Sequence, residues 1–440
     1  MRVAIPSQFF RSAEYLYAIL ALFLLTQGPV YRMWSQSSGL AGFLSEPSVS
    51  HAHFATFLCI QAPGVLLWFR RCNCEWLNRQ SNTALVAFLV WLVLTVCWST
   101  FARQSLPEVL AIVTTTGFGL YLADRFTSIH FWLVITGAMA IGVGITWVSV
   151  MRVWDGAVNF QEGYWIGIYF NRNSLAPVAG LAIVSCLGVL LSIQMRRERM
   201  DQRLAVLLSL LTVTVAVYAA IELWKSKSQT SPLALAIAVS TSGLWLFIQA
   251  TCRRVRAFRR FSPFSAPLAL VVVSIAVFSI LRIVGGFGSL SSETTSLNMR
   301  RALWSLSWSG FLEKPWQGWG WMAAWKTPDF FRQGNWWAVF DTSWSHNGYH
   351  DLLLGGGVLA ALLFVTFILL GVSAFGRCAP KEALPRMLAV SFVLAAATQE
   401  SFFIGSHFLW AVLVAALASP VVDEALVDQK HSCEVTPRSS

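Results

Sequence analysis

The chain has 440 residues, of which 56% are hydrophobic and only 12% are charged, and its mean hydropathy is +0.60. Soluble domains carry about 25% charged residues, so this composition excludes an ordinary soluble enzyme and indicates a polytopic membrane protein. The formal net charge is +11, but the basic residues are spread over many short segments, which does not favour a nucleic-acid partner. We therefore expect an all-α protein whose main surroundings are the lipid bilayer.

Apolar runs that approach the roughly 20 residues of a spanning helix recur along the whole chain. We predict about twelve transmembrane helices, near residues 13–31, 52–69, 82–100, 106–123, 130–150, 174–193, 203–224, 231–250, 265–285, 349–374, 386–399 and 402–419. Together they form a single transmembrane domain over residues 1–419. Residues 420–440 lose the apolar periodicity, which predicts a disordered cytoplasmic tail.

The segments between the predicted helices differ in charge. One alternating set, which includes both tails, holds 20 Lys and Arg residues, whereas the other set is longer and holds 12. The positive-inside rule places the first set, and with it both termini, in the cytoplasm. The second set then faces outward, and its longest member is the loop 286–348 between the ninth and tenth helices.

Within this loop, apolar residues recur at helical spacing from residue 296 to 313. Trp304, Trp308, Phe311 and Leu312 stand at i, i+4, i+7 and i+8, which predicts an amphipathic helix in the plane of the membrane interface. Pro315 ends the pattern.

Two arginines, Arg300 and Arg301, lie near the start of that predicted helix, and they have two interpretations. They can be interfacial anchors that extend their charged ends toward water. Alternatively, they bind a phosphate at the headgroup level, because the planar guanidinium fork matches phosphate oxygens.

Nine tryptophans lie between Trp304 and Trp344. They have two interpretations, an aromatic belt at the membrane surface or platforms that stack on sugar rings. The segment PWQGWGW, with Gly318 and Gly320, predicts a tight turn among them.

His346 lies at the outer end of the tenth predicted helix, in the sequence SHNGYHD. An imidazole with an unperturbed pKa of about 6.5 can take a proton from a hydroxyl near neutral pH. A lone external histidine is more often a bystander, but the nearby arginines favour a catalytic role. The external segments contain no paired carboxylates, since Asp341 and Asp351 are isolated, so we expect chemistry without a metal or other cofactor.

Five short stretches resemble motifs of one family. HNGYHDLLLGGG resembles the signature that ends the large periplasmic loop in the O-antigen ligase and polysaccharide polymerase superfamily. MRRALW followed by PWQGWG resembles the loop motifs that precede that signature, and VCWSTFARQ, GIYFNRNSLA and SKSQTSPLAL resemble three earlier motifs. They occur in the family's order and on one predicted face, over about residues 85 to 415.

The resemblance implies a GT-C-like integral membrane glycosyltransferase of the bacterial inner membrane. Such enzymes transfer a glycan from undecaprenyl diphosphate to an acceptor glycan hydroxyl on the outer face. The resemblance implies that His346 is the catalytic base and that Arg300, helped by Arg301, binds the diphosphate. Lys227 is implied as a second diphosphate-binding cation, where the family has arginine.

Further residues of the matching motifs are candidates for substrate binding. These are Arg172, Asn173, Trp304, Asn347 and Tyr349. His350 stands where the family usually has leucine, and we interpret it as a residue of the following helix. The roles of Glu222 and Glu400, at outer helix ends, remain open at this point.

The leading hypothesis is an inverting polymerase that extends an exopolysaccharide or an O-antigen-type polysaccharide. An O-antigen ligase that joins the glycan to lipid A-core shares all of these motifs and is the alternative. A transporter or flippase for a lipid-linked sugar is a different class. Few ionisable residues at span centres and no internal repeat argue against it. Other membrane proteins of polysaccharide assembly are conceivable partners.

Overall fold

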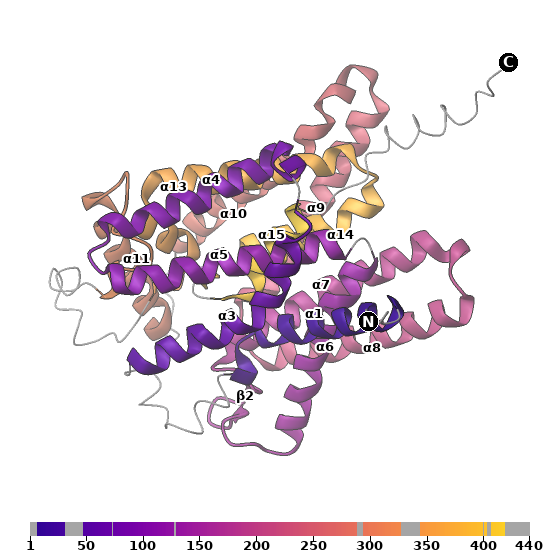
Figure 1. Ribbon diagram of the computed structural model, residues 1–440, viewed down its shortest axis with the longest axis horizontal. Helices are drawn as coiled ribbons and strands as arrows, with labels where there is room; N and C mark the ends of the chain where they lie inside the picture. Colours follow the sequence, from indigo (N-terminus) through magenta and orange to yellow (C-terminus); the bar gives the residue numbers. More distant parts are fainter. Residues whose placement is uncertain are drawn as a thin grey trace, which may run out of the picture.

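The computed structural model describes residues 7–30, 47–72, 74–126, 129–287, 294–326, 344–398, 400–402 and 406–418. Almost all of these residues are helical, and most of the long helices run nearly parallel to one another (Figure 1). The predicted all-α polytopic architecture is thereby confirmed. The predicted tail lies outside the described residues, as do residues 288–293 and 327–343 of the large loop.

The α-helices are α1 (Ser7–Leu24), α3 (Pro47–Phe69), α4 (Gln80–Leu94), α5 (Ala102–Arg125), α6 (Ile129–Met151), α7 (Arg172–Arg196), α8 (Gln202–Lys225), α9 (Thr230–Arg254), α10 (Ser265–Phe287), α11 (Thr294–Glu313), α13 (Gly348–Ser373), α14 (Pro380–Ala396) and α15 (Phe408–Ala418). Short 3₁₀ helices are η1 (Cys74–Asn78), η2 (Thr95–Trp98), η3 (Arg197–Arg199), η4 (Arg256–Phe264), η5 (Ala324–Lys326) and η7 (Ala374–Arg377). Two short antiparallel strands, β1 (Val158–Asn159) and β2 (Tyr164–Trp165), form a hairpin between α6 and α7.

Eight of the described helices are long and apolar enough to cross a membrane, and two shorter apolar helices span Phe54–Phe69 and Phe408–Ala418. Each of the twelve predicted ranges overlaps a described helix. Their number as membrane crossings stays a prediction, because length and composition support fewer of them. The one predicted interfacial helix corresponds to α11.

The core centres on α15, whose residues are all buried. It packs against α5, α14 and α13, and α14 in turn packs against α7 and α9. Close approach requires small residues. A Cβ at Gly119 of α5 would lie 2.7 Å from the carbonyl oxygen of Ala411, so only glycine allows these two backbones to touch. By contrast, α8 and α10 are largely exposed, as expected of helices that face lipid.

The helix α13 is interrupted at Gly357, which has a left-handed backbone with φ of 70°. The predicted turn at Gly318 and Gly320 is confirmed, with φ of 67° and 98°, and it packs against this interruption. Three backbone hydrogen bonds join the two segments. They run from Trp319 N to the Leu354 carbonyl (2.9 Å), from Gly320 N to the Gly355 carbonyl (3.1 Å) and from Val358 N to the Pro315 carbonyl (2.8 Å).

The helix predicted over residues 296–313 exists as α11, but its predicted apolar face is partly wrong. Trp308 and Leu312 are exposed, whereas Leu303, Ser307 and Phe311 are buried. The reason is tertiary, because α11 packs against α13 and against the turn after Pro315. That packing selects a different face from the one that the largest apolar side chains suggest.

The interpretation of the loop tryptophans as a belt or as sugar platforms is wrong for three of them. Trp319, Trp321 and Trp325 are buried, whereas Trp316 is exposed. The indole of Trp319 donates a hydrogen bond to the Gly310 carbonyl at 2.7 Å. Trp319 and Trp325 form a small apolar cluster of the loop with Leu303, Ala324 and Leu354, whereas Trp321 belongs to the main core.

Candidate active site

His346 lies in the turn that leads into α13, and its backbone is left-handed with φ of 53°. The next residue, Asn347, caps the helix, because its side-chain oxygen accepts from Tyr349 N at 3.0 Å and from His350 N at 3.3 Å. The His-Asn pair therefore has a local reason. Asn347 is the N-cap of α13, so His346 lies in the turn directly before the helix.

Buried hydrogen bonds support this turn from behind. Ser345 N donates to the Asp351 carboxylate at 3.0 Å, and the indole of Trp325 donates to the same oxygen at 3.0 Å. The Ser345 hydroxyl also donates to the Asn347 carbonyl at 2.7 Å. Asp351 thus anchors the turn through these two donors. A non-glycine residue with positive φ persists only where its surroundings hold it in this way.

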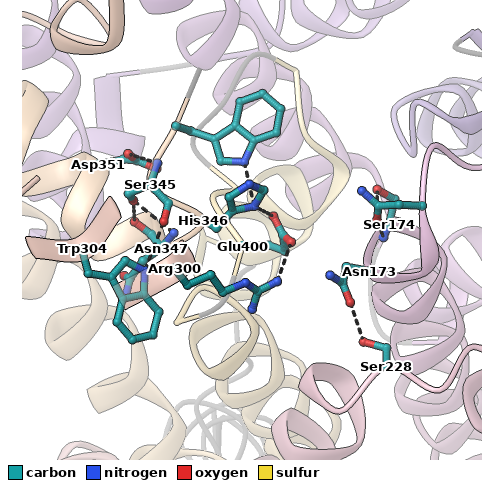
Figure 2. Close-up of polar contacts among 12 residues, drawn as sticks. Asn173, Ser174, Ser228, Arg300, Trp304, Ser345, His346, Asn347, Asp351 and Glu400 are labelled. Atoms are coloured by element: carbon teal, nitrogen blue, oxygen red, sulfur yellow. Dashed lines mark hydrogen bonds and ion pairs between the residues drawn. The ribbon is translucent and has the colours of Figure 1, made fainter. Parts of the chain in front are cut away.

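The His346 imidazole contacts Glu400, which lies between α14 and α15 (Figure 2). Its Nδ1 is 3.1 Å from Glu400 Oε2, and the other carboxylate oxygen is 3.5 Å from an Arg300 guanidinium nitrogen. The side chains of Arg300, Glu400 and His346 remain 17%, 25% and 29% exposed. The three groups therefore form a cation–carboxylate–imidazole cluster that a substrate can still reach.

The contacts of Nδ1 bear on which imidazole nitrogen can act as a base. Trp344 Nε1 lies 3.2 Å from the same Nδ1, so this nitrogen has both a donor and a carboxylate beside it. The Trp344 indole can donate to Nδ1 only where Nδ1 carries no proton, whereas Nδ1 can donate to Glu400 only in the other tautomer, which a carboxylate acceptor favours. The lone pair is then on Nε2, which is the arrangement that a general base requires.

Two of the predicted site residues beside this turn, and also His350, have structural partners. The Trp304 indole donates to the Ser345 carbonyl at 3.1 Å, which joins α11 to the turn. Tyr349 donates to the Leu394 carbonyl of α14 at 2.7 Å, and His350 Nδ1 lies 2.7 Å from the Ser307 hydroxyl of α11. Arg301 is exposed on α11 beside Arg300. The interpretation of His350 as a helix residue agrees with its contact to Ser307.

The remaining predicted residues lie together in a second cluster, at the start of α7 and just after the end of α8. Lys227 donates from Nζ to the Glu162 carbonyl in the β1–β2 hairpin at 2.7 Å. Asn173 accepts from the Ser228 hydroxyl at 3.0 Å, and the Arg172 guanidinium lies 4.9 Å from the centre of the Tyr164 ring. In Figure 2, Asn173 and Ser228 lie across from Glu400 and His346.

The structure also brings together motifs that the sequence separates widely. Trp98 donates to the Gln317 carbonyl at 3.2 Å, and a Cβ on Gly320 would lie 2.5 Å from Ser99. The early Trp-Ser motif therefore packs directly under the PWQGWG turn. The Asn173–Ser228 contact joins the NRNSLA and SKSQTS motifs in the same way.

Sequence reasoning did not assign Glu400, and its signal was limited to a charged residue at an outer helix end. Glu222 is also a charged residue near a helix end, but its side chain is fully buried. The described residues offer its carboxylate oxygens no hydrogen-bond partner. Among the residues that the structure describes, no group of three or more His, Cys, Asp or Glu side chains is placed to hold a metal ion.

Comparison with known proteins finds a family match over part of the chain. Residues 214–365 match the family model described as O-Antigen ligase, and a search of curated proteins found no match. The matched range begins in α8 and ends in α13, so it contains Lys227, Arg300 and His346 but not Arg172 or Glu400. Members of this family transfer lipid-linked glycans. This match supports the superfamily of O-antigen ligases and polymerases that the motifs of the chain resemble.

Proposed function

We propose that this protein is a glycosyltransferase that moves a glycan from undecaprenyl diphosphate to an acceptor sugar hydroxyl. The observation that carries the proposal is the contact of His346 Nδ1 with Glu400, whose other oxygen contacts Arg300. One base beside fixed cations is the minimum that this reaction needs. The diphosphate is already a good leaving group, so a general acid is not essential.

In the proposed reaction, the acceptor hydroxyl oxygen attacks the anomeric carbon of the lipid-linked sugar. The bond from that carbon to the diphosphate oxygen breaks, and its electron pair leaves with the diphosphate. His346 Nε2 takes the hydroxyl proton, while Glu400 holds Nδ1–H and stabilises the imidazolium that forms. Attack opposite the leaving group inverts the anomeric carbon.

The cations compensate the charge that develops on the leaving diphosphate. Arg300 is held by Glu400 on one side, and Lys227 is held by the Glu162 carbonyl on the other. Both retain further N–H groups that can donate to phosphate oxygens, and Arg301 adds a third charge beside Arg300. Cations that are already positioned stabilise the transition state without reorganisation. The donor's diphosphate then lies between the two clusters, within reach of Arg172 and Asn173.

A polysaccharide polymerase of the bacterial inner membrane, with both termini in the cytoplasm, is the form of this function that we favour. Support for it comes from the form of the HNGY motif and from the tryptophan-rich loop. The description of the matched family favours a second candidate, a ligase that joins the glycan to lipid A-core. The two differ in the acceptor, and the proposed base and cations serve both.

The test uses purified protein and undecaprenyl diphosphate that carries one repeat unit. A ladder of longer lipid-linked products from the wild type, together with free undecaprenyl diphosphate, is the expected result for a polymerase. Product with a lipid A-core acceptor alone identifies a ligase. If neither acceptor releases the diphosphate lipid, the glycosyltransferase proposal is wrong and transport is measured instead.

A further inference from the structure

A groove lies between α6 and α8, and its lining includes none of the residues of the two clusters of the candidate active site. Its volume is about 470 Å³. The residues that line it are Ala140, Val143, Gly144, Trp147, Val148, Met151, Arg152, Thr214, Val215 and Tyr218. All of these except Arg152 lie in two helices that are long and apolar enough to span a membrane. The groove therefore opens toward lipid, and its natural occupant is a lipid chain.

Gly144 leaves room in the groove for an acyl chain. Gly144 has open space where a side chain would be, with no atom within 4 Å of an added Cβ. Trp147 and Tyr218 form a wall, with ring centroids 4.7 Å apart at an interplanar angle of 89°. Trp and Tyr side chains are characteristic of the level at which lipid chains meet the headgroups.

Arg152 is the one charged residue among those that line the groove, and it follows the last residue of α6. Its side chain is exposed, and no hydrogen bond or ion pair joins its guanidinium to another of the described residues. A guanidinium at the headgroup level has a natural partner in a phosphate, whose oxygens match its fork of donors. The groove thus combines an apolar slot with one phosphate-binding cation at its outer end.

We propose that this groove binds one phospholipid of the outer leaflet, with its phosphate on Arg152 and an acyl chain over Gly144. From Ala140 to Arg152 the helix rises by about 18 Å. Half of a bilayer's hydrocarbon core is about 15 Å thick, so the groove matches a single leaflet. A much longer polyprenyl chain would exceed this length, and its diphosphate would require more than one cation.

The proposed lipid has a structural consequence for the neighbouring hairpin. Trp147 packs edge-on against Trp165 of β2, with ring centroids 5.1 Å apart. The same hairpin holds Lys227 through the Glu162 carbonyl. A lipid that fills the groove therefore steadies the hairpin that positions Lys227. The binding site itself does not depend on the proposed glycosyl transfer.

The test compares two leucine substitutions. Gly144→Leu fills the groove, whereas Gly243→Leu is a matched control in α9, because Gly243 also has no atom within 4 Å of an added Cβ. Each protein is purified in mild detergent, its bound lipid is identified by native mass spectrometry, and its Tm is followed as phosphatidylglycerol is added. Wild type and Gly243→Leu should retain the phospholipid and gain Tm. Gly144→Leu should lose the Tm response and bind at least about tenfold less, equivalent to about 1.4 kcal/mol.

A second pair of variants tests the headgroup and does not depend on the folding of Gly144→Leu. Arg152→Gln should weaken phospholipid binding, whereas Arg103→Gln, at an exposed arginine near the start of α5, should not. Equal phospholipid retention by wild type, Gly144→Leu and Arg152→Gln would overturn the proposal. Recovery of an isoprenoid lipid in place of the phospholipid, lost on Gly144→Leu, would overturn it as well.

Discussion

The two clusters of the candidate site are built differently. Around His346, side chains hold one another, since Glu400 contacts both the imidazole and Arg300, and Asp351 anchors the turn behind them. Around Lys227, one cation rests on a backbone carbonyl of a short hairpin. The contacts of the first cluster fix both the position and the orientation of its side chains. The contact of the second cluster mainly fixes the position of the Lys227 charge.

Because the two clusters are built differently, we expect them to tolerate different substitutions. A network of directional contacts fails when one member changes shape, even if its charge is kept. A single ammonium on a flexible stem is a point charge, so another cation can replace it. The predictions below test this contrast, beginning with the largest expected effect.

His346→Ala should lower kcat by about 100- to 10,000-fold, the usual contribution of a general base. The cations remain in place, so binding of the undecaprenyl-diphosphate donor should change little. Rates of release of the diphosphate lipid and a separate donor-binding measurement check this. A mutant that retains kcat would show that His346 is not the base.

Glu400→Gln should lower kcat by about 10- to 100-fold, since an outer partner that orients an imidazole has this typical effect. The KM for the donor should rise less, because Glu400 acts through His346 and Arg300 rather than on the lipid itself. Glu382→Gln is the control, since Glu382 is exposed in the first turn of α14, at the opposite end of that helix from Glu400. Equal activity of the two variants would remove Glu400 from the mechanism.

Charge-conserving exchanges should separate the two clusters. Lys227→Arg should keep the donor KM nearly unchanged, whereas Lys227→Gln should raise it about tenfold, because hydrogen bonds to charged groups contribute about 1.5–3 kcal/mol. Arg300→Lys should also cost about tenfold in kcat/KM, since it loses the fork that contacts Glu400. Similar tolerance of Lys227→Arg and Arg300→Lys would contradict the contrast drawn above.

Gly357→Ala should destabilise the packing of the loop on α13 by about 3 kcal/mol, from left-handed strain and steric overlap. An added Cβ would lie 2.3 Å from the Trp316 carbonyl oxygen, at a residue with φ of 70°. Thermal unfolding in detergent measures the loss. Gly243→Ala is the control, because a Cβ at Gly243 meets no atom within 4 Å and its Tm should not fall.

Several features of this protein follow from the order of its residues alone. Apolar runs of helical length determine an all-α membrane protein, because unpaired backbone groups are not tolerated in lipid. The PWQGWG turn follows from its glycines, and the resemblance to the family follows from short motifs in a fixed order. The signal for His346 is local as well, since Asn347 caps the helix that begins just after it.

Other features exist only in the folded chain. The buried face of α11 is determined by its packing against α13. Trp319 and Trp325 are buried in the loop's own apolar cluster, and Trp321 is buried in the main core. Glu400 lies 54 positions from His346, and no pattern in the sequence pairs them. Helical periodicity and helix capping depend on residues that are close in the chain, so the sequence alone predicts them. Contacts between helices depend on how the whole bundle closes, and therefore only the tertiary structure decides them.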